Sequence, residues 1–443
     1  MKRTSAVRDP RAWLDSHINL ERGIGIPSAT ARATAPTRDR IQALLSLLGR
    51  PELEFSTVHI TGTNGKTSTA RMAATLFDSL GMRTGLYTSP DLGRINERIL
   101  MELQPIPDEE LDELLQVVAL CEPSLEKPPS YFEILTAAAL RGFCDIAVDV
   151  GVIEVGLGGT WDATTEVDGR VAVVSNIALD HENFLGSSLP EIALEKSGII
   201  KSHSHLVLGE TDPDLRSIFL DRSPRSVWER DRDFGVVSEQ VAIGGRVVEL
   251  FTPGGTHEIF LPLHGVHQAD NAALALASAE AFLGDPIDSE TARHAFANVT
   301  SPGRLEVVGR QPLVILDGAH NVAGAQSLRR ALAEEFTIDG QRTLVVGLLR
   351  EKDPKEMLAA LGADDCTLLI LCPPPSPRAL DPRLIEQAAR ELGYPEDQIE
   401  IAEDVRGAVG LAVLETPRDG QIVVTGSLYV VGAARSMFLG VGR

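Results

Sequence analysis

The chain of 443 residues is too long for one ordinary core at roughly 150 residues per domain, and fits two or three domains. It holds 41 Lys and Arg against 63 Asp and Glu, for a formal charge of −22, and 43% of its residues are apolar. This balance indicates a globular protein and disfavours sequence-independent binding to nucleic acid or to an anionic membrane. Positive contacts to anionic substrates must therefore be local.

The N-terminal stretch MKRTSAVRDPRAWLDSH lacks the apolar region of a signal peptide. No run approaches the roughly 18 apolar residues of a membrane span. The four cysteines show neither a CxxC pair nor a zinc-like spacing; they are Cys121, Cys144, Cys366 and Cys372. We therefore expect a cytoplasmic protein with reduced thiols and with no nucleic-acid or membrane partner.

Short β-branched runs alternate with helical patterns, which predicts a doubly wound α/β protein. Strands are expected at 57–60, 150–155 and 171–175, and helices at 72–80 and 268–283. A further helix is expected between Glu182 and Lys201, with a capping box at 188–191 and Gly198 near its end. A Pro- and Gly-containing linker is predicted at 298–303, with a break near Ser301. A second series follows, with strands at 313–316, 344–348, 367–371 and 421–425. Two domains are expected, 1–300 and a smaller α/β domain at 301–443.

Two short segments in this scheme are interpreted as loops. Residues 373–377, Pro-Pro-Pro-Ser-Pro, form the low-complexity feature of the chain, and a loop is the simplest interpretation. His203 and His205 are interpreted as part of a solvated loop.

The strongest motif is Thr61-Gly-Thr-Asn-Gly-Lys-Thr67, which follows a predicted strand and opens a predicted helix. It departs from the common GxxxxGK[ST] spacing because position 60 is Ile. Backbone N–H groups freed by the glycines and the helix N-terminus can face anionic oxygens, Lys66 adds a charge, and the Thr67 hydroxyl can reach Mg²⁺. A lone GKT is more often an ordinary turn. This context favours a phosphate loop, with ATP contacts from Thr63, Asn64, Gly65, Lys66 and Thr67.

A set of motifs spread from about residue 15 to the C-terminus resembles the Mur ligase superfamily, in its folylpolyglutamate synthase and dihydrofolate synthase branch. TGTNGKT is the nucleotide-loop form of that superfamily. The branch is indicated by YTSPDL at 87–92, NERI at 96–99, FExxT at 132–136, EVGLGG at 154–159, DAT at 162–164 and DH at 180–181, then by EKSGII at 195–200, HQxxN at 267–271, PGR at 302–304 and DGAHN at 317–321.

The resemblance implies a P-loop-type, mostly parallel ATPase domain and a smaller, Rossmann-like C-terminal glutamate-ligase domain. It implies a monomer that joins L-glutamate to a pteroate or folate carboxylate, using ATP. The carboxylate attacks the γ-phosphate, and the amine then opens the acyl phosphate. Positioning and charge neutralisation supply most of the catalysis in such a transfer. Lys66, His181 and Lys196 are the implied catalytic residues.

The implied metal ligands are Ser89, Glu154, His181 and Lys196, at two Mg²⁺ sites, and a monovalent cation is a further possible cofactor. Glu154 ends a predicted buried strand, where an ionised carboxylate is costly unless it is paired. Its structural alternative is a carboxylate satisfied by backbone N–H groups. Taken singly, His181 would more often be a structural or surface histidine. An imidazole is also less usual for magnesium than oxygen ligands.

Lys196 near a helix end would by itself be interpreted as a solvated lysine at the helix C-terminus. In the family, the lysine at this place in Glu-Lys-small-Gly-Ile carries a carbamate formed with carbon dioxide. The modification turns a cation into an anion that can help to hold magnesium. Carbamylation needs the neutral amine, so burial near the site is expected to lower the pKa of Lys196.

For the second half of the site, the resemblance implies contacts across a cleft between the domains. Asn271 is expected at the adenine, Arg304 at the ATP phosphates and Asp317 at the nucleotide, while His320 is expected near the incoming glutamate. Closing such a cleft would exclude water from the acyl phosphate.

For the acid substrate, residues 88–98 resemble the family's Ω-loop, and Phe132, Trp161, Asp162 and Ala163 are expected to line the pteroate pocket. An aromatic ring over a flat pterin is physically sensible, although either aromatic could belong to the core. The chain departs from the usual pattern at Asp91, where His is common, at Thr160-Trp161, where Arg-Leu is common, and in GKT, where GKG is commoner. These departures bear on the choice of acid rather than on the ATP chemistry.

Two alternatives remain open. One is a Mur-type ligase acting on a different carboxylate, such as a cell-wall precursor or another cofactor. The other is a nucleotide-dependent switch ATPase, which needs a phosphate loop but no acceptor site for an amino acid. Arg304, the 317–320 segment and Lys196 favour the ligase.

Overall fold

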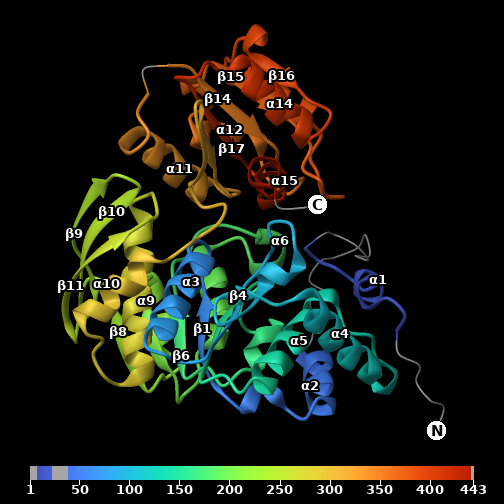
Figure 1. Ribbon diagram of the computed structural model, residues 1–443, viewed down its shortest axis with the longest axis vertical. Coiled ribbons are helices and arrows are strands. Elements are labelled where there is room, and N and C mark those ends of the chain that lie inside the picture. Colours follow the sequence, from blue (N-terminus) through green and yellow to red (C-terminus); the bar gives the residue numbers. More distant parts are fainter. Residues whose placement is uncertain (1–6, 22–37, 339, 441–443) are drawn as a thin grey trace.

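The chain folds around three β-sheets in a computed structural model that describes residues 7–21, 38–338 and 340–440. Figure 1 shows two α/β units stacked along the long axis. The large unit comprises the described residues up to 297 and holds an 8-stranded and a 3-stranded sheet; the C-terminal unit, 306–440, holds a 6-stranded sheet. The α/β class with two mostly parallel sheets is confirmed. The predicted division at 300/301 falls in the coil that connects the units.

The 8-stranded sheet has the order β4-β3-β2-β5-β1-β6-β7-β8 and is parallel except at β2–β3 and β3–β4. Ile60 of β1 lies level with Glu154 of β5 and with Val173 of β6. The carboxyl ends of these neighbouring strands therefore share one edge, which is where parallel sheets bind ligands. The strands are β1 Ser56–Thr61, β2 Thr84–Tyr87, β3 Ile99–Met101, β4 Gln104–Pro105, β5 Val150–Glu154, β6 Val171–Val174, β7 His205–Leu208 and β8 Ser226–Glu229.

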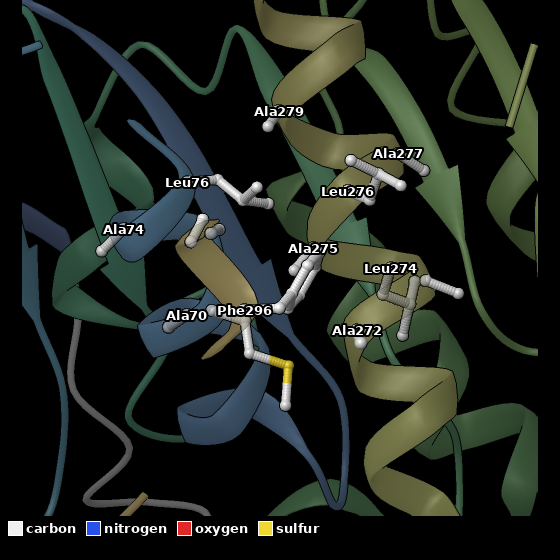
Figure 2. Close-up of a cluster of buried hydrophobic side chains, with 14 of the residues drawn as sticks. Ala70, Ala74, Leu76, Ala272, Leu274, Ala275, Leu276, Ala277, Ala279 and Phe296 are labelled. Carbon is white, nitrogen blue, oxygen red and sulfur yellow. The ribbon is translucent and has the colours of Figure 1, made fainter. Parts of the chain in front are cut away.

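Helices cover this sheet. α3 (Lys66–Ser79) packs on α9 (His267–Leu283) and α10 (Ser289–Ala297), and Figure 2 shows the small side chains, among them Ala70 and Ala275, that let α3 and α9 approach closely. Two further apolar clusters of the large unit are separate from the one that holds α3, α9 and α10, and other helices contribute to them. They involve α1 Pro10–Asp15, α2 Arg38–Leu47, α4 Asp108–Cys121, α5 Tyr131–Asp145, α6 Glu182–Leu185, α7 Leu189–Lys196 and α8 Pro213–Leu220.

A three-stranded antiparallel sheet, which the sequence patterns did not predict, extends the core around α9. It consists of β9 Gly235–Ala242, β10 Gly245–Thr252 and β11 Gly255–Leu261, in the order β11-β10-β9. Val248, Leu250, Ile259 and Leu261 alternate along β10 and β11 and are buried in the cluster that holds α3 and α9.

The C-terminal sheet has the order β12-β13-β17-β14-β15-β16 and is parallel except at β12–β13. Its strands are β12 Glu306–Arg310, β13 Leu313–Leu316, β14 Arg342–Val346, β15 Leu368–Leu371, β16 Ile399–Ile401 and β17 Gln421–Thr425. Separate apolar clusters on its two faces hold two sets of helices. The first set is α11 Val322–Glu334, α12 Pro354–Leu361 and α13 Pro382–Glu391; the second is α14 Val405–Glu415 and α15 Leu428–Leu439.

The helix predicted between 182 and 201, with its capping box at Ser188, is confirmed as α7, where the Ser188 N–H donates to the Glu191 carboxylate at 3.2 Å. The short α6 before it ends at Gly186, at φ +111°. One local prediction was wrong. His205 begins β7, half-buried, with Nδ1 at 2.7 Å from Ser226 Oγ, whereas His203 is exposed as expected. The loop prediction for 373–377 is confirmed. Across the described ranges, no helix has both the length and the apolar character that crossing a membrane requires.

Candidate active site

The phosphate loop, residues 61–67, joins β1 to α3 at the carboxyl edge of the large sheet. Gly62 and Gly65 have φ of +148° and +83°, which residues with a side chain rarely adopt. A Cβ added to Gly62 would lie 1.8 Å from Ser175 Oγ, and a Cβ added to Gly65 would lie 2.3 Å from Asn271 Oδ1. Both glycines are therefore required. Gly65 caps α3, whose first N–H groups and dipole favour an anion.

Thr63 and Asn64 tie the phosphate loop to the segment that follows β6. The Thr63 N–H donates to Asn176 O at 2.8 Å, and the Asn64 N–H donates to Asn176 Oδ1 at 2.9 Å. Ser175 Oγ donates to Asn64 O at 2.6 Å. The N–H groups of Thr63 and Asn64 are thus used to fix the shape of the loop. The N–H groups at the start of α3 are the ones that face a phosphate.

Two lysine amines meet at one backbone carbonyl. Lys66 Nζ donates to Gly62 O at 3.0 Å and to Thr63 O at 3.1 Å, and Lys196 Nζ donates to Gly62 O at 2.7 Å. Lys196 is only 4% exposed. Burial, reinforced by the charge of Lys66, lowers the pKa of Lys196 to about 7, in the direction expected from the sequence. A large share of this amine is therefore neutral near neutral pH.

Glu154 ends β5 beside the phosphate loop and is 1% exposed. Its carboxylate accepts from Thr67 Oγ1 at 2.8 Å and from the Ser89 N–H at 3.2 Å. Burial raises the pKa of Glu154, while Lys66 and the hydrogen bond from Thr67 oppose the shift. The structure thus brings Glu154, Ser89 and the start of α3 together.

The oxygen groups at this place are suitable ligands for a magnesium ion beside a phosphate. A buried carboxylate and two hydroxyls, Thr67 and Ser89, are the hard oxygen groups that the ion prefers. Among the described residues, no cluster of three or more His, Cys, Asp or Glu side chains could hold a metal by itself. The Thr67 hydroxyl is the nearest further oxygen group to the Glu154 carboxylate that the hydrogen bonds give, at 2.8 Å.

His181 and Asp180 follow the segment that braces the phosphate loop. His181 adopts a left-handed conformation at φ +52° and precedes α6, with Nε2 at 3.9 Å from Asp180 Oδ1. The His181 side chain is 38% exposed; partial desolvation in the cavity still lowers the pKa of His181, although the Asp180 charge opposes this. Burial opposes ionisation of Asp180, but the hydrogen bond from His320 and nearby positive charges lower its pKa.

Asp180 also joins the two units. Lys352 Nζ reaches Asp180 Oδ1 at 2.5 Å, and Asn321 Nδ2 donates to Asp180 Oδ2 at 2.9 Å and to Asn64 Oδ1 at 3.0 Å. His320 Nε2 lies 3.5 Å from Asp180 Oδ2. No sequence motif pointed to Lys352, and Asp180 could be noticed only as the neighbour of His181.

Both ends of α11 contact the large unit. Asn321, at its N-terminus, makes the contacts just described. At its C-terminus, Glu335 accepts from the Gly265 N–H at 2.7 Å, lies 3.0 Å from His264 Nδ1 and pairs with Arg246 of β10. The Glu335 side chain is fully buried there.

The other predicted nucleotide contacts face the same cleft. Asn271 on α9 donates to Gln268 Oε1 at 3.0 Å and lies against Gly65. Asp317 accepts from the N–H groups of Leu305 and Ala319, each at 2.9 Å, and burial raises the pKa of Asp317 against the effect of Arg304. The carboxylate thus holds the coil that carries Arg304.

Phe132, Trp161, Asp162 and Ala163 line the part of the cavity that was predicted to take the acid, and we call this part the acid pocket. Phe132 and Ala163 belong to the core with α5, whereas Trp161 packs with the core of α6 and α7, so the aromatics come from different walls. Asp162 accepts from the Leu157 N–H at 2.9 Å and from Thr164 Oγ1 at 2.6 Å. Burial raises the pKa of Asp162, and the Thr164 hydrogen bond opposes the rise.

The departures from the family pattern have structural partners. Thr160 Oγ1 donates to Glu195 O at 3.1 Å, and its N–H donates to Glu195 Oε1 at 2.8 Å, so Thr160 braces the end of α7 next to Lys196. Asp91 accepts from Arg98 Nε at 2.7 Å.

All the predicted site residues line one cavity of about 1110 Å³ between the units. Their individual roles stay predictions, but the structure brings them together. The cavity is also lined by residues that were not predicted, among them Ile18, Leu20, Glu21, Lys352, Arg378 and Tyr429.

Comparison with known proteins identifies the family. Residues 60–279 match the Mur ligase middle domain and residues 303–428 match the Mur ligase glutamate ligase domain. The dihydrofolate synthase/folylpolyglutamate synthase of Mycobacterium tuberculosis is 40% identical, over 91% of this chain and 90% of that protein.

Two solved structures share the fold over nearly the whole chain. The M. tuberculosis folylpolyglutamate synthase complexed with ADP and AMPPCP has a TM-score of 0.86 at 40% identity, covering 92% of this chain and 96% of that one. Escherichia coli FolC in complex with DHPP and ADP has a TM-score of 0.84 at 28% identity, covering 98% of each chain. The chain therefore belongs to the dihydrofolate synthase/folylpolyglutamate synthase family of the Mur ligases.

Proposed function

We propose that this protein is an ATP-dependent acid–amino acid ligase that joins L-glutamate to dihydropteroate, to reduced folates or to both. The carrying observation is that the phosphate loop, the acid pocket and residues of the C-terminal unit line one cavity. Relatives named for this activity, and solved relatives complexed with ADP, AMPPCP or DHPP, support the proposal.

The reaction needs a carboxylate of the acid to be activated. Its oxygen attacks the γ-phosphorus of ATP, the bond to the β-phosphate oxygen breaks, and ADP leaves. The glutamate amine then attacks the acyl carbon, loses a proton and expels phosphate. Lys66 and the start of α3 neutralise the phosphates from the large unit, and Arg304 does so from the connecting coil.

Ser89, Glu154, His181 and Lys196 would hold Mg²⁺ at two sites, where the ion supplies charge neutralisation and orientation of the phosphates. Thr67 Oγ1, already within 2.8 Å of Glu154, is placed to join them. Asn271 and Asp317 hold the nucleotide side of the cleft. A monovalent cation is a further cofactor we propose from the family resemblance.

We further propose that Lys196 carries a carbamate. The neutral amine attacks carbon dioxide, a C–N bond forms, and the nitrogen loses a proton to leave a carboxylate. The burial of Lys196 and its lowered pKa favour this chemistry, and an anion there removes the repulsion between Lys66 and Lys196 at the Gly62 carbonyl.

The acid would lie between Phe132 and Trp161, with the Asp162 carboxylate facing its polar edge and Ala163 leaving space for the ring. His320 would face the incoming glutamate. Closure of the two units would then keep water from the acyl phosphate.

All these residues come from one chain, which supports a monomer, and the four free thiols fit a reducing, cytoplasmic compartment.

An ADP-release assay tests the proposal. Dihydropteroate and tetrahydrofolate are offered separately with L-glutamate, and products are identified by mass. We expect ADP release that depends on both the acid and glutamate, with a product heavier by one glutamyl residue. Release that ignores glutamate would instead indicate a switch ATPase, and failure of both acids would refute the folate assignment in favour of a ligase for another carboxylate.

A further inference from the structure

Residues 7–21 cross the surface of the large unit and reach the cavity between the units. Arg11 pairs with Asp108 of α4 at 2.7 Å, and Trp13 Nε1 donates to Glu122 at 2.8 Å. The Ile18 carbonyl accepts from the Tyr131 N–H at the start of α5, at 2.9 Å. The segment is thus fixed to the large unit along its length before it reaches the cavity, which Ile18, Leu20 and Glu21 line.

The side chain of Glu21 is held by the 88–98 loop. Both of its carboxylate oxygens accept from Arg98, at 3.0 and 2.5 Å, and Arg98 Nε donates to Asp91 at 2.7 Å. The Arg98 side chain is only 4% exposed. A bidentate pair that is enclosed in this way fixes both partners. Asp91, where the family commonly has His, is thus part of what orients Arg98 in this chain.

The backbone carbonyl of Glu21 is held by the other unit. Arg378 Nη1 donates to it at 2.7 Å and Tyr429 Oη donates to it at 2.9 Å. These donors come from separate segments of the C-terminal unit, the coil after β15 and the first turn of α15. Arg378 is oriented in turn by Glu351 at 2.7 Å. The carbonyl oxygen of Glu21 therefore accepts two hydrogen bonds, and both come from the C-terminal unit.

We propose that the Glu21 carbonyl couples the acid pocket to the C-terminal unit, with Arg378 and Tyr429 as positioning residues for the ligation reaction. The inference rests on the proposed function, because it assigns the pocket to the acid. An acid in the pocket packs against Ile18 and Leu20 of this already anchored segment, and the Glu21 carbonyl holds the C-terminal unit in the orientation that brings Arg304 and His320 to the cleft.

The first test is kinetic and uses Tyr429→Phe, which removes one hydroxyl, and Arg378→Met. Tyr394→Phe is the matched control, because that phenol donates to Cys366 O inside the C-terminal unit. We expect kcat/KM for the acid to fall about tenfold in each test variant and further in the double variant, with the Kd for ATP unchanged. The control should match wild type.

The second test measures orientation without turnover. Spin labels are placed at Arg293 and Gln387, which are exposed on α10 and α13, in a Cys121→Ser, Cys144→Ser background. With ADP and dihydropteroate, the wild-type background should give one narrow interlabel distance, and Tyr429→Phe should broaden it. Wild-type kcat/KM together with an unbroadened distance in Tyr429→Phe overturns the proposal. If wild type ligates neither acid, the proposed function fails, while the distances still decide whether the coupling exists.

Discussion

Lowering the pH should destabilise this protein through one buried histidine. His59 lies in the middle of β1, just before the phosphate loop, and is fully buried. Its Nε2 is 2.8 Å from Thr164 Oγ1, which itself donates to Asp162, so Nε2 must carry the proton. Nδ1 is buried and has no hydrogen-bond partner among the residues that the structure describes. Burial, with a contribution from the charge of Lys201, lowers the pKa of His59 to about 3.

The sign and size of the effect follow from this shift. The unfolded chain, with a histidine pKa of about 6.5, binds the proton first, so stability is present above that pH and is lost as the pH falls through it toward the folded value. The loss from His59 alone is about 0.8 kcal/mol at pH 6 and about 2 kcal/mol at pH 5.

His59→Gln isolates this contribution, because the amide can still donate to Thr164 and does not titrate. Urea unfolding is measured for both proteins from about pH 7.5 to pH 5. The difference in unfolding free energy, wild type minus variant, should fall by about 2 kcal/mol over that range. His294→Gln, on the exposed surface of α10, is the matched control for replacing a histidine by glutamine. A flat difference for His59→Gln would refute the reasoning.

Three further predictions concern the site. Lys196→Ala should fold normally but lose most ligation, and carbon dioxide-depleted wild type should regain activity with bicarbonate; an active variant that ignores bicarbonate would exclude the carbamate. Glu154→Gln should lower kcat/KM for ATP about a hundredfold and shift the Mg²⁺ titration of ADP release to higher concentration, whereas an unchanged titration would remove Glu154 from the metal site. Gly65→Ala should abolish binding of a fluorescent ATP analogue, because its Cβ would lie 2.3 Å from Asn271 Oδ1 at a φ of +83°; a normal Kd would contradict that requirement.

The sequence predicted those parts of the site that depend on local order along the chain. The phosphate loop directly follows one predicted strand and Glu154 lies at the end of another, and in a parallel sheet neighbouring strand ends must lie together. The burial of Lys196 was expected through the family resemblance, since its helix position alone suggested solvent. The departure from the family pattern at Thr160 is explained by the hydrogen bond from its hydroxyl to the backbone carbonyl of Glu195, which is 35 residues away in the chain.

Contacts between distant segments could not be predicted in this way. Asp180 and Lys352 are separated by 172 residues, and Glu21 and Tyr429 by 408. Such pairs depend on how the two units pack, and neither spacing nor periodicity encodes that packing. The three-stranded sheet was missed for a different reason: its half-exposed strands, such as β9, mix polar and apolar residues without a clear alternation.

The attachment of α11 at both ends limits how the cleft can open. Asn321 is fixed to Asp180 and Asn64 at one end, and Glu335 is fixed to Arg246 and Gly265 at the other. The two attachment points define a rotation axis, and the 13 residues of α11 separate the two points by about 20 Å. A movement that keeps both attachments turns the C-terminal unit about that axis, and such a turn acts on the remaining contacts between the units, among them those at Glu21.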